Sequence, residues 1–189
     1  MHELEPYYKW RELYVAAEDE ASPFFGREYS EMYLSNTVYN YYIHPQWDEF
    51  GSATLYLKVL FVSYDANYAI IEFIGEWNDA IYNDVMHLYR NVIEEFMLHD
   101  ITHFILIGEN VLNFHSGGSD YYEEWFDNIG DGWIVGLNFR QHVVDEFCSE
   151  NIDYYIAFKG EFDDFNWRSF LPDQLFGEIN SVVNKRLGM

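Results

Sequence analysis

Cysteine is almost absent from this chain, which limits its redox and metal chemistry. Cys148 is the single cysteine among 189 residues, so the chain excludes an internal disulfide and a zinc site built from several cysteines. Its neighbours Val144 and Phe147 are of core type. A free thiol among such residues is expected to pack as a small apolar side chain.

Long apolar runs and an amino-terminal targeting pattern are also missing. No segment approaches the roughly 18 to 20 apolar residues of a membrane-spanning helix. The residues from Met1 to Pro6 lack the basic start and apolar stretch of a signal peptide. We therefore expect a cytoplasmic protein.

Basic residues are few: 10 Lys and Arg stand against 33 Asp and Glu, and the formal net charge is −23. A field of this sign repels nucleic-acid phosphates and anionic lipid headgroups. Nucleic acid and membranes are therefore poor candidate partners, and basic proteins or cations are better ones. A surface that favours solubility, or a host adapted to high salt, would explain the same charge. The charge therefore excludes classes of partner but does not identify a partner.

Aromatic residues, in contrast, are abundant at 21% of the chain. This is more than a core needs, and exposed Tyr and Trp rings favour interfaces. Two acidic-aromatic loops provide candidate contact residues, at which carboxylates would select a basic partner. The alternative is that the rings fold back onto the core while the acids stay in solvent. The five candidates are Trp47, Phe50, Phe162, Phe165 and Trp167.

The first part of the chain predicts an extension over residues 1–53. Residues from Tyr7 to Ala17 have the apolar spacing of a short amphipathic helix. Residues from Thr37 to Ile43 are rich in β-branched and aromatic types, which indicates a strand.

The middle of the chain alternates strands and helices. Residues 55–61 and 68–74 read as two strands joined by a short turn, which predicts an antiparallel hairpin. The second strand is apolar on both faces except at Glu72, as expected for a central strand. Further strands are expected at 103–112, 133–139 and 153–158, with helices at 120–126, at 141–148 and from 172 onward. Between the second and third strands, a helix capped by Asn78 or Asp79 should carry an apolar stripe of Ile81, Val85, Leu88, Val92 and Phe96.

This order predicts an α/β fold with a single mixed β-sheet, partly parallel and flanked by helices. The whole chain, 1–189, is expected to be one domain. Its core spans 54–158, and residues 159–189 add an acidic-aromatic loop and a carboxy-terminal helix.

The turn after the strand at 103–112 is the best candidate site. Strand-to-helix turns of α/β proteins are where ligands and partners bind, because helix N–H groups and side chains converge there. This turn offers two hydroxyls, an imidazole and a carboxylate. The predicted binding or switch residues are His115, Ser116, Gly117, Gly118, Ser119 and Asp120.

Residues 54–158 resemble STAS domains, which occur in anti-sigma-factor antagonists and sulphate transporter tails. Gly75-Glu76-Trp77-Asn78 stands where those domains have a Gly-Glu-Leu-Asp-like step from the hairpin into a long helix. Leu112-Asn113-Phe114-His115-Ser116-Gly117-Gly118 stands where they have a Phe-Ile-Asp-Ser-Ser-Gly-like turn. Gly130-Asp131-Gly132 then matches a glycine-rich turn before another strand and helix.

The resemblance implies a regulatory role in which a partner kinase phosphorylates the serine at the position of Ser116. The sequence departs from the family pattern around it, since His115 replaces the aspartate and Gly117 replaces the second serine. Gly118-Ser119 also replaces a glycine-leucine pair. The alternative is that Ser116 only starts a turn or caps the next helix.

A metal-dependent enzyme is the main rival interpretation. His142 with Asp145 or Glu146 has helical spacing, and His115 or Glu109 could complete a group of two histidines and a carboxylate. No recognised motif joins these residues, and the nucleophile elbow and the nucleotide-binding glycine loops are absent.

We therefore predict a non-catalytic regulatory or protein-interaction module, similar to anti-sigma-factor antagonists, with a switch turn at residues 115–120. No catalytic residue, metal or cofactor is predicted. The expected partner is a protein, for which a basic surface is favoured, or a second copy of the chain. A metal-dependent enzyme using His115, His142 and nearby carboxylates, or a homo-oligomer of unknown role, are the alternatives.

Overall fold

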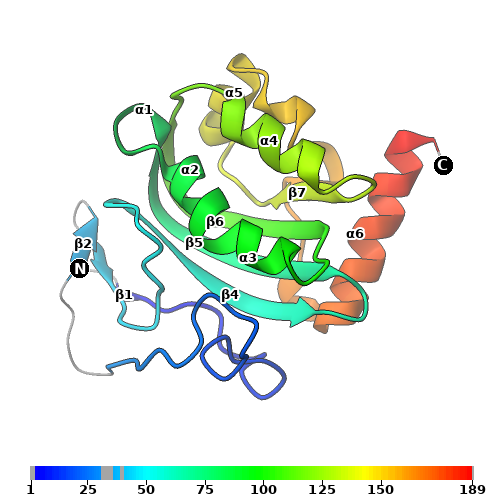
Figure 1. The fold of residues 1–189 in the computed structure, drawn as a ribbon. Helices are drawn as coiled ribbons and strands as arrows, with labels where there is room; N and C mark the ends of the chain where they lie inside the picture. Colours follow the sequence, from blue (N-terminus) through cyan, green and yellow to red (C-terminus); the bar gives the residue numbers. More distant parts are fainter. Residues whose placement is uncertain (1–2, 31–35, 39–40, 189) are drawn as a thin grey trace.

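The chain folds around a mixed four-stranded sheet with helices on both faces (Figure 1). The structure is a computed structural model that describes residues 3–30, 36–38 and 41–188. The strands lie in the order β4-β5-β6-β7, with bounds β4 (Leu55–Ser63), β5 (Tyr68–Asn78), β6 (His103–His115) and β7 (Trp133–Leu137). The predicted α/β class is confirmed.

The sheet begins with the expected hairpin. β4 pairs antiparallel with β5, which in turn pairs parallel with β6, and β6 pairs parallel with β7. Both β5 and β6 extend beyond their predicted ends, because pairing continues past two irregularities in register until Asn78 faces His115. At Gly75 the backbone has a φ of +119°, and an added Cβ would lie 2.1 Å from the carbonyl oxygen of Thr54. Glycine at this position lets the long strand keep its close contact with the residues before β4.

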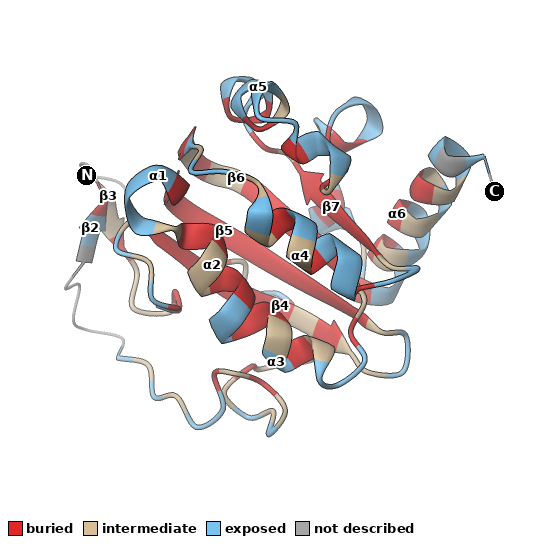
Figure 2. Cartoon of the chain, turned by 45° about the horizontal axis from the view of Figure 1, so that its top comes forward, coloured by how far each residue is buried: buried red, intermediate tan, exposed pale blue. Residues whose placement is uncertain are grey.

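One face of the sheet packs against helices that follow the parallel strands. α4 (Asp120–Asn128) and α5 (Gln141–Ser149) lie there. The broken helix after β5 lies beside them, and its segments are α1 (Asp79–Tyr82), α2 (Asp84–Leu88), the π-helix η1 (Tyr89–Ile93) and α3 (Glu94–Met97). Figure 2 shows β4 and β5 as buried strands beneath these helices.

The opposite face of the sheet packs against α6 (Pro172–Leu187). Ile70 and Ile105 project from the strands on this side, and Leu175 and Ile179 of α6 are buried against them. Three short 3₁₀ helices lead to α6, namely η2 (Ile152–Tyr154), η3 (Gly160–Phe162) and η4 (Trp167–Ser169). α6 begins at Pro172, as predicted, because proline suits the first helical turn.

The helix predicted after β5 differs from a single regular helix. Asn83 adopts a left-handed conformation with a φ of 53°, which ends α1 after four residues and restarts the chain in α2. Val85, Leu88, Val92 and Phe96 are buried as predicted. Ile81 is not, because the break turns it outward, and 73% of its surface is exposed.

Two predicted elements are wrong. Residues 7–17 form turns and no helix, although Trp10 is buried against the α6 face of the sheet. Residues 153–158 form no regular strand, since the chain makes a single bridge from Ala157 to Val135 at the edge of β7. Both segments follow the surface of the core, and packing there outweighs the preference of their sequences for helix or strand.

The strand expected from Thr37 to Ile43 is two strands. β2 (Asn36–Val38) and β3 (Tyr41–Ile43) pair antiparallel, and residues 39–40 between them lie outside the described part of the chain. β1 (Glu3–Leu4) pairs parallel with β3. The single predicted sheet is therefore corrected to a four-stranded sheet plus a separate three-stranded one.

Within the described residues, no helix has the length and apolar character needed to cross a bilayer. Cys148 packs against the core on the α5 side as predicted, but it is only partly buried.

Candidate functional site

The candidate site lies where β5 and β6 end side by side. Asn78 and His115 are paired across these two strands. β5 then continues directly into α1, while β6 continues into the turn at 116–119 and then α4. The carboxyl ends of adjacent parallel strands are a common position for binding sites in α/β proteins.

Two buried aspartates hold the β5–α1 corner, which we define as residues 77–85. The Asp79 carboxylate accepts hydrogen bonds from the Trp77 indole N–H at 3.1 Å, the Val85 backbone N–H at 2.8 Å and the Tyr122 hydroxyl at 2.6 Å. The Asp84 carboxylate accepts one from the Asn78 backbone N–H at 2.7 Å. These bonds fix α1 to the end of β5 and, through Tyr122, to α4.

Burial dominates the electrostatics of this corner. It raises the pKa of Asp79 to about 6, although hydrogen bonds from Tyr122 and the Val85 backbone act in the opposite direction. Burial also raises the pKa of Asp84. The Oδ1 atom of Asp84 is buried without a hydrogen-bond partner. The corner therefore contains carboxylates whose ionisation is costly.

The turn after β6 lies directly against this corner. An added Cβ at Gly117 would lie 2.4 Å from the carbonyl oxygen of Asp79, so glycine permits this close approach. The Ser116 hydroxyl accepts a hydrogen bond from the Gly118 backbone N–H at 3.3 Å. His115 is half-exposed and its Nε2 lies 2.7 Å from a carboxylate oxygen of Glu76.

A hollow of about 300 Å³ opens between the corner, the turn and the start of α4. We call it the α1–α4 hollow. Ile81 lines it with 73% of its surface exposed, and the neighbouring Tyr82 is 41% exposed. Figure 2 shows most of α1 as exposed. The lining residues are Asp79, Ala80, Ile81, Asn83, Val85, Gly117, Gly118, Asp120 and Tyr121.

The structure brings part of the predicted switch turn into this hollow. Gly117, Gly118 and Asp120 line it. Ser116 and Ser119 belong to the same turn but are not among the lining residues. Sequence reasoning missed the contribution of α1. A signal for it is present, because the Asn-Asp pair at 78–79 recurs at 83–84, and Asn favours both helix caps and left-handed positions.

The residues of the rival metal site have other partners. The Nε2 of His142 lies 2.8 Å from the Leu112 carbonyl oxygen, and His115 faces Glu76. Glu109 accepts hydrogen bonds from Asn138, Trp167 and Arg168. Over residues 3–30, 36–38 and 41–188, no three His, Cys, Asp or Glu side chains are grouped so that they could hold a metal ion.

The five aromatic contact candidates are mostly part of the core. The rings of Trp47, Phe50, Phe162 and Trp167 are buried, and Phe165 is half-buried. Their expected exposure is thus corrected, because the loops fold back over hydrophobic clusters. Glu161, Asp163 and Asp164 stay exposed, as the alternative interpretation predicted.

Asp48 is the exception among the loop acids, because it is fully buried. It accepts hydrogen bonds from Lys58 and Arg27, each at 3.1 Å, and from the Tyr29 hydroxyl at 2.6 Å. Burial lowers the pKa of Lys58, and the Asp48 charge opposes that effect. This cluster ties residues 27–29 to β4.

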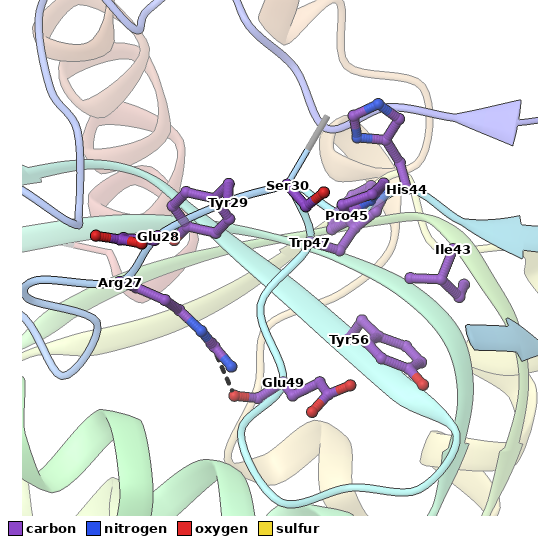
Figure 3. Close-up of a pocket in the computed structure, with 10 residues that line it drawn as sticks. All are labelled: Arg27, Glu28, Tyr29, Ser30, Ile43, His44, Pro45, Trp47, Glu49 and Tyr56. Carbon is purple, nitrogen blue, oxygen red and sulfur yellow. Dashed lines mark hydrogen bonds between the residues drawn. The ribbon is translucent and has the colours of Figure 1, made fainter. Parts of the chain in front are cut away.

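A second hollow of about 280 Å³ lies beside this cluster (Figure 3). Trp47, Tyr56 and Ile43 line it together with Arg27 and Ser30. The Arg27 guanidinium already bonds to the Glu49 carbonyl oxygen at 3.0 Å, as well as to Asp48. Because its cation is engaged and its edge at Ser30 adjoins residues outside the described chain, this hollow is the weaker candidate.

No family model matches this chain, and no curated protein sequence matches it significantly.

Proposed function

We propose that this protein is a non-catalytic protein-interaction module whose contact surface is the α1–α4 hollow and the adjoining turn at 115–120. The exposed side chain of Ile81 at the rim of this hollow carries the proposal. Tyr82 lies next to it and is also partly exposed. Large apolar side chains beside a hollow are typical of surfaces that bind a partner.

The anchoring of the corner supports this interpretation. A single exposed apolar residue is common on protein surfaces, but Ile81 belongs to a segment that hydrogen bonds to the buried Asp79 and Asp84 hold in place. Burying these carboxylates costs free energy. A rigid surface loses less conformational entropy when a partner binds, which is a functional reason to maintain such a corner.

The resemblance to STAS domains supports a regulatory role, with Ser116 as the switch residue. A phosphate would add about −1.5 to −2 charges beside α4 and close to the Asp79 backbone that Gly117 contacts. A phosphate on Ser116 would change both the charge and the hydrogen bonding of this turn. We infer that modification at Ser116 would weaken a contact made through the α1–α4 hollow.

Affinity capture with three baits tests the proposal. Wild type, Ile81→Ser and Leu98→Ser are compared, since Leu98 is 75% exposed and lies after α3, away from the hollow. We expect a protein that wild type and Leu98→Ser retain and Ile81→Ser loses. Equal retention by all three baits would contradict the proposal.

The switch and self-association are tested separately. Ser116→Glu is expected to release the same captured protein, whereas Ser149→Glu, placed at the end of α5, is expected to retain it. Sedimentation velocity of the purified chain then shows whether Ile81 instead mediates contact between two copies.

A further inference from the structure

The α1–α4 hollow carries negative charge without a compensating basic residue in its lining. Asp79 and Asp120 are the two charged residues among the nine that line it, and Lys, Arg and His are absent from them. The nearby Arg90 forms ion pairs with Glu94 and Glu124, so its charge is already balanced. The chain as a whole has a net charge of −23, which adds to the same field.

The two carboxylates differ in their capacity to bind. Asp79 is buried and already accepts three hydrogen bonds, so it contributes through its charge. Asp120 is exposed in the first turn of α4 and can accept bonds from a bound group. The hollow therefore offers one accessible acceptor above a buried negative charge, beside the apolar surface of Ile81.

We propose that this hollow receives a lysine or arginine side chain from a partner segment whose apolar residue packs on Ile81 and Tyr82. The inference rests on the proposed function and names its partner chemistry. At about 300 Å³, the hollow is at the lower limit of small-molecule pockets, a size suited to one or two side chains. Charge complementarity favours a cation over an anion in this position.

Short peptides of defined composition test this preference by nuclear magnetic resonance. The isotope-labelled protein is titrated with acetyl-Leu-Arg-Leu-Arg-amide, and acetyl-Leu-Glu-Leu-Glu-amide is the matched control. Shifts of the backbone amides at 80–82 and 117–121 report binding in the hollow. The Leu-Arg peptide is expected to shift these amides saturably, and the Leu-Glu peptide is not.

Two variants separate specific binding from general attraction to an acidic protein. Asp120→Asn is expected to weaken binding of the Leu-Arg peptide about two- to fivefold, the size typical of one exposed ion pair. Asp131→Asn removes the same charge from an exposed turn before β7, at the other end of the sheet, and is expected to leave affinity unchanged.

The result that overturns the inference is a Leu-Arg titration whose shifts are spread over the acidic surface or are equally affected by both variants. Equal binding of the Leu-Glu peptide at the hollow would also overturn it, yet leave the hollow as a contact surface. The proposed function is tested separately, by whether affinity capture of a protein depends on Ile81. Amide shifts in the hollow that change with protein concentration alone would identify a second copy as the occupant and overturn the inference.

Discussion

The hydroxyl of Tyr122 donates a hydrogen bond to Asp79 at 2.6 Å, between two residues that are both buried. Tyr122 belongs to α4 and Asp79 begins α1. This bond joins the two sides of the α1–α4 hollow from beneath. It also faces a carboxylate whose pKa burial raises to about 6, so the hydroxyl stabilises a charge that the core otherwise disfavours.

Tyr122→Phe keeps the ring and removes only this donor. One oxygen of a buried carboxylate then loses its partner, and we expect the free energy of unfolding to fall by about 1–3 kcal/mol. Urea denaturation measures the change. Tyr154→Phe is the control, because Tyr154 is exposed. A loss no larger than that of the control would contradict the role of the bond.

Glu72→Gln tests a third buried carboxylate with a raised pKa, which lies outside the β5–α1 corner. Glu72 lies in β5, accepts the Tyr7 backbone N–H at 2.8 Å, and burial raises its pKa to about 7 from an ordinary value of 4.5. As the pH rises, the unfolded chain loses this proton first, so between about pH 4.5 and 7 the folded state binds more protons. Ionised Glu72 therefore costs stability above this range.

We expect Glu72→Gln to gain stability relative to wild type as the pH rises from 5 to 8, by on the order of 3 kcal/mol. Glutamine keeps an acceptor for Tyr7 and does not ionise. Thermal or urea unfolding at both pH values measures the difference. Glu150→Gln, on an exposed residue, should show no such trend. Parallel pH profiles of wild type and Glu72→Gln would rule out the effect.

Gly117→Ala and Gly177→Ala should act in opposite directions. At Gly117 the added methyl meets the Asp79 carbonyl oxygen, and this contact is expected to destabilise the protein by about 1–3 kcal/mol. At Gly177, inside α6, no heavy atom lies within 4 Å of an added Cβ. Alanine there should stabilise by about 0.5–1 kcal/mol. A Gly117→Ala variant as stable as wild type would show that the turn tolerates displacement from the corner.

Asp48→Asn tests the buried charge cluster of the amino-terminal extension. The change leaves Lys58 buried without its carboxylate, for which we expect a loss of about 3–5 kcal/mol. Asp164→Asn is the matched control because Asp164 is exposed. Adding Lys58→Met to Asp48→Asn should recover part of the loss, since no buried cation is then left unpaired. If the double variant is no more stable than Asp48→Asn, the charge is not the cause.

Hydrophobic periodicity predicts the strands of the four-stranded sheet and most of its covering helices, but neither the separate three-stranded sheet nor the break at Asn83. The hairpin, β6, β7, α4, α5 and the start of α6 follow from apolar runs, caps and turn residues. The amino-terminal segment was not predictable in this way, because Trp10 is held by a ring contact with Trp167, which lies far along the chain. The spacing of apolar residues within a short segment gives no information about contacts with distant parts of the chain.

The candidate site was predictable in part for the same reason. The turn from His115 to Asp120 follows from a strand that ends in small polar residues. The partnership of this turn with α1 depends on the left-handed Asn83 and on the bond between Tyr122 and Asp79. Regular helical spacing assigned Ile81 to the core, whereas the break at Asn83 exposes it.

The most direct test of the central claim is quantitative affinity capture with Ile81→Ser and Leu98→Ser as paired baits from isotope-labelled lysates. If the α1–α4 hollow is a contact surface, at least one protein should be depleted about tenfold or more on the Ile81→Ser bait relative to the Leu98→Ser bait. That ratio corresponds to about 1.4 kcal/mol of binding free energy. Equal recovery of every captured protein on the two baits would contradict the claim.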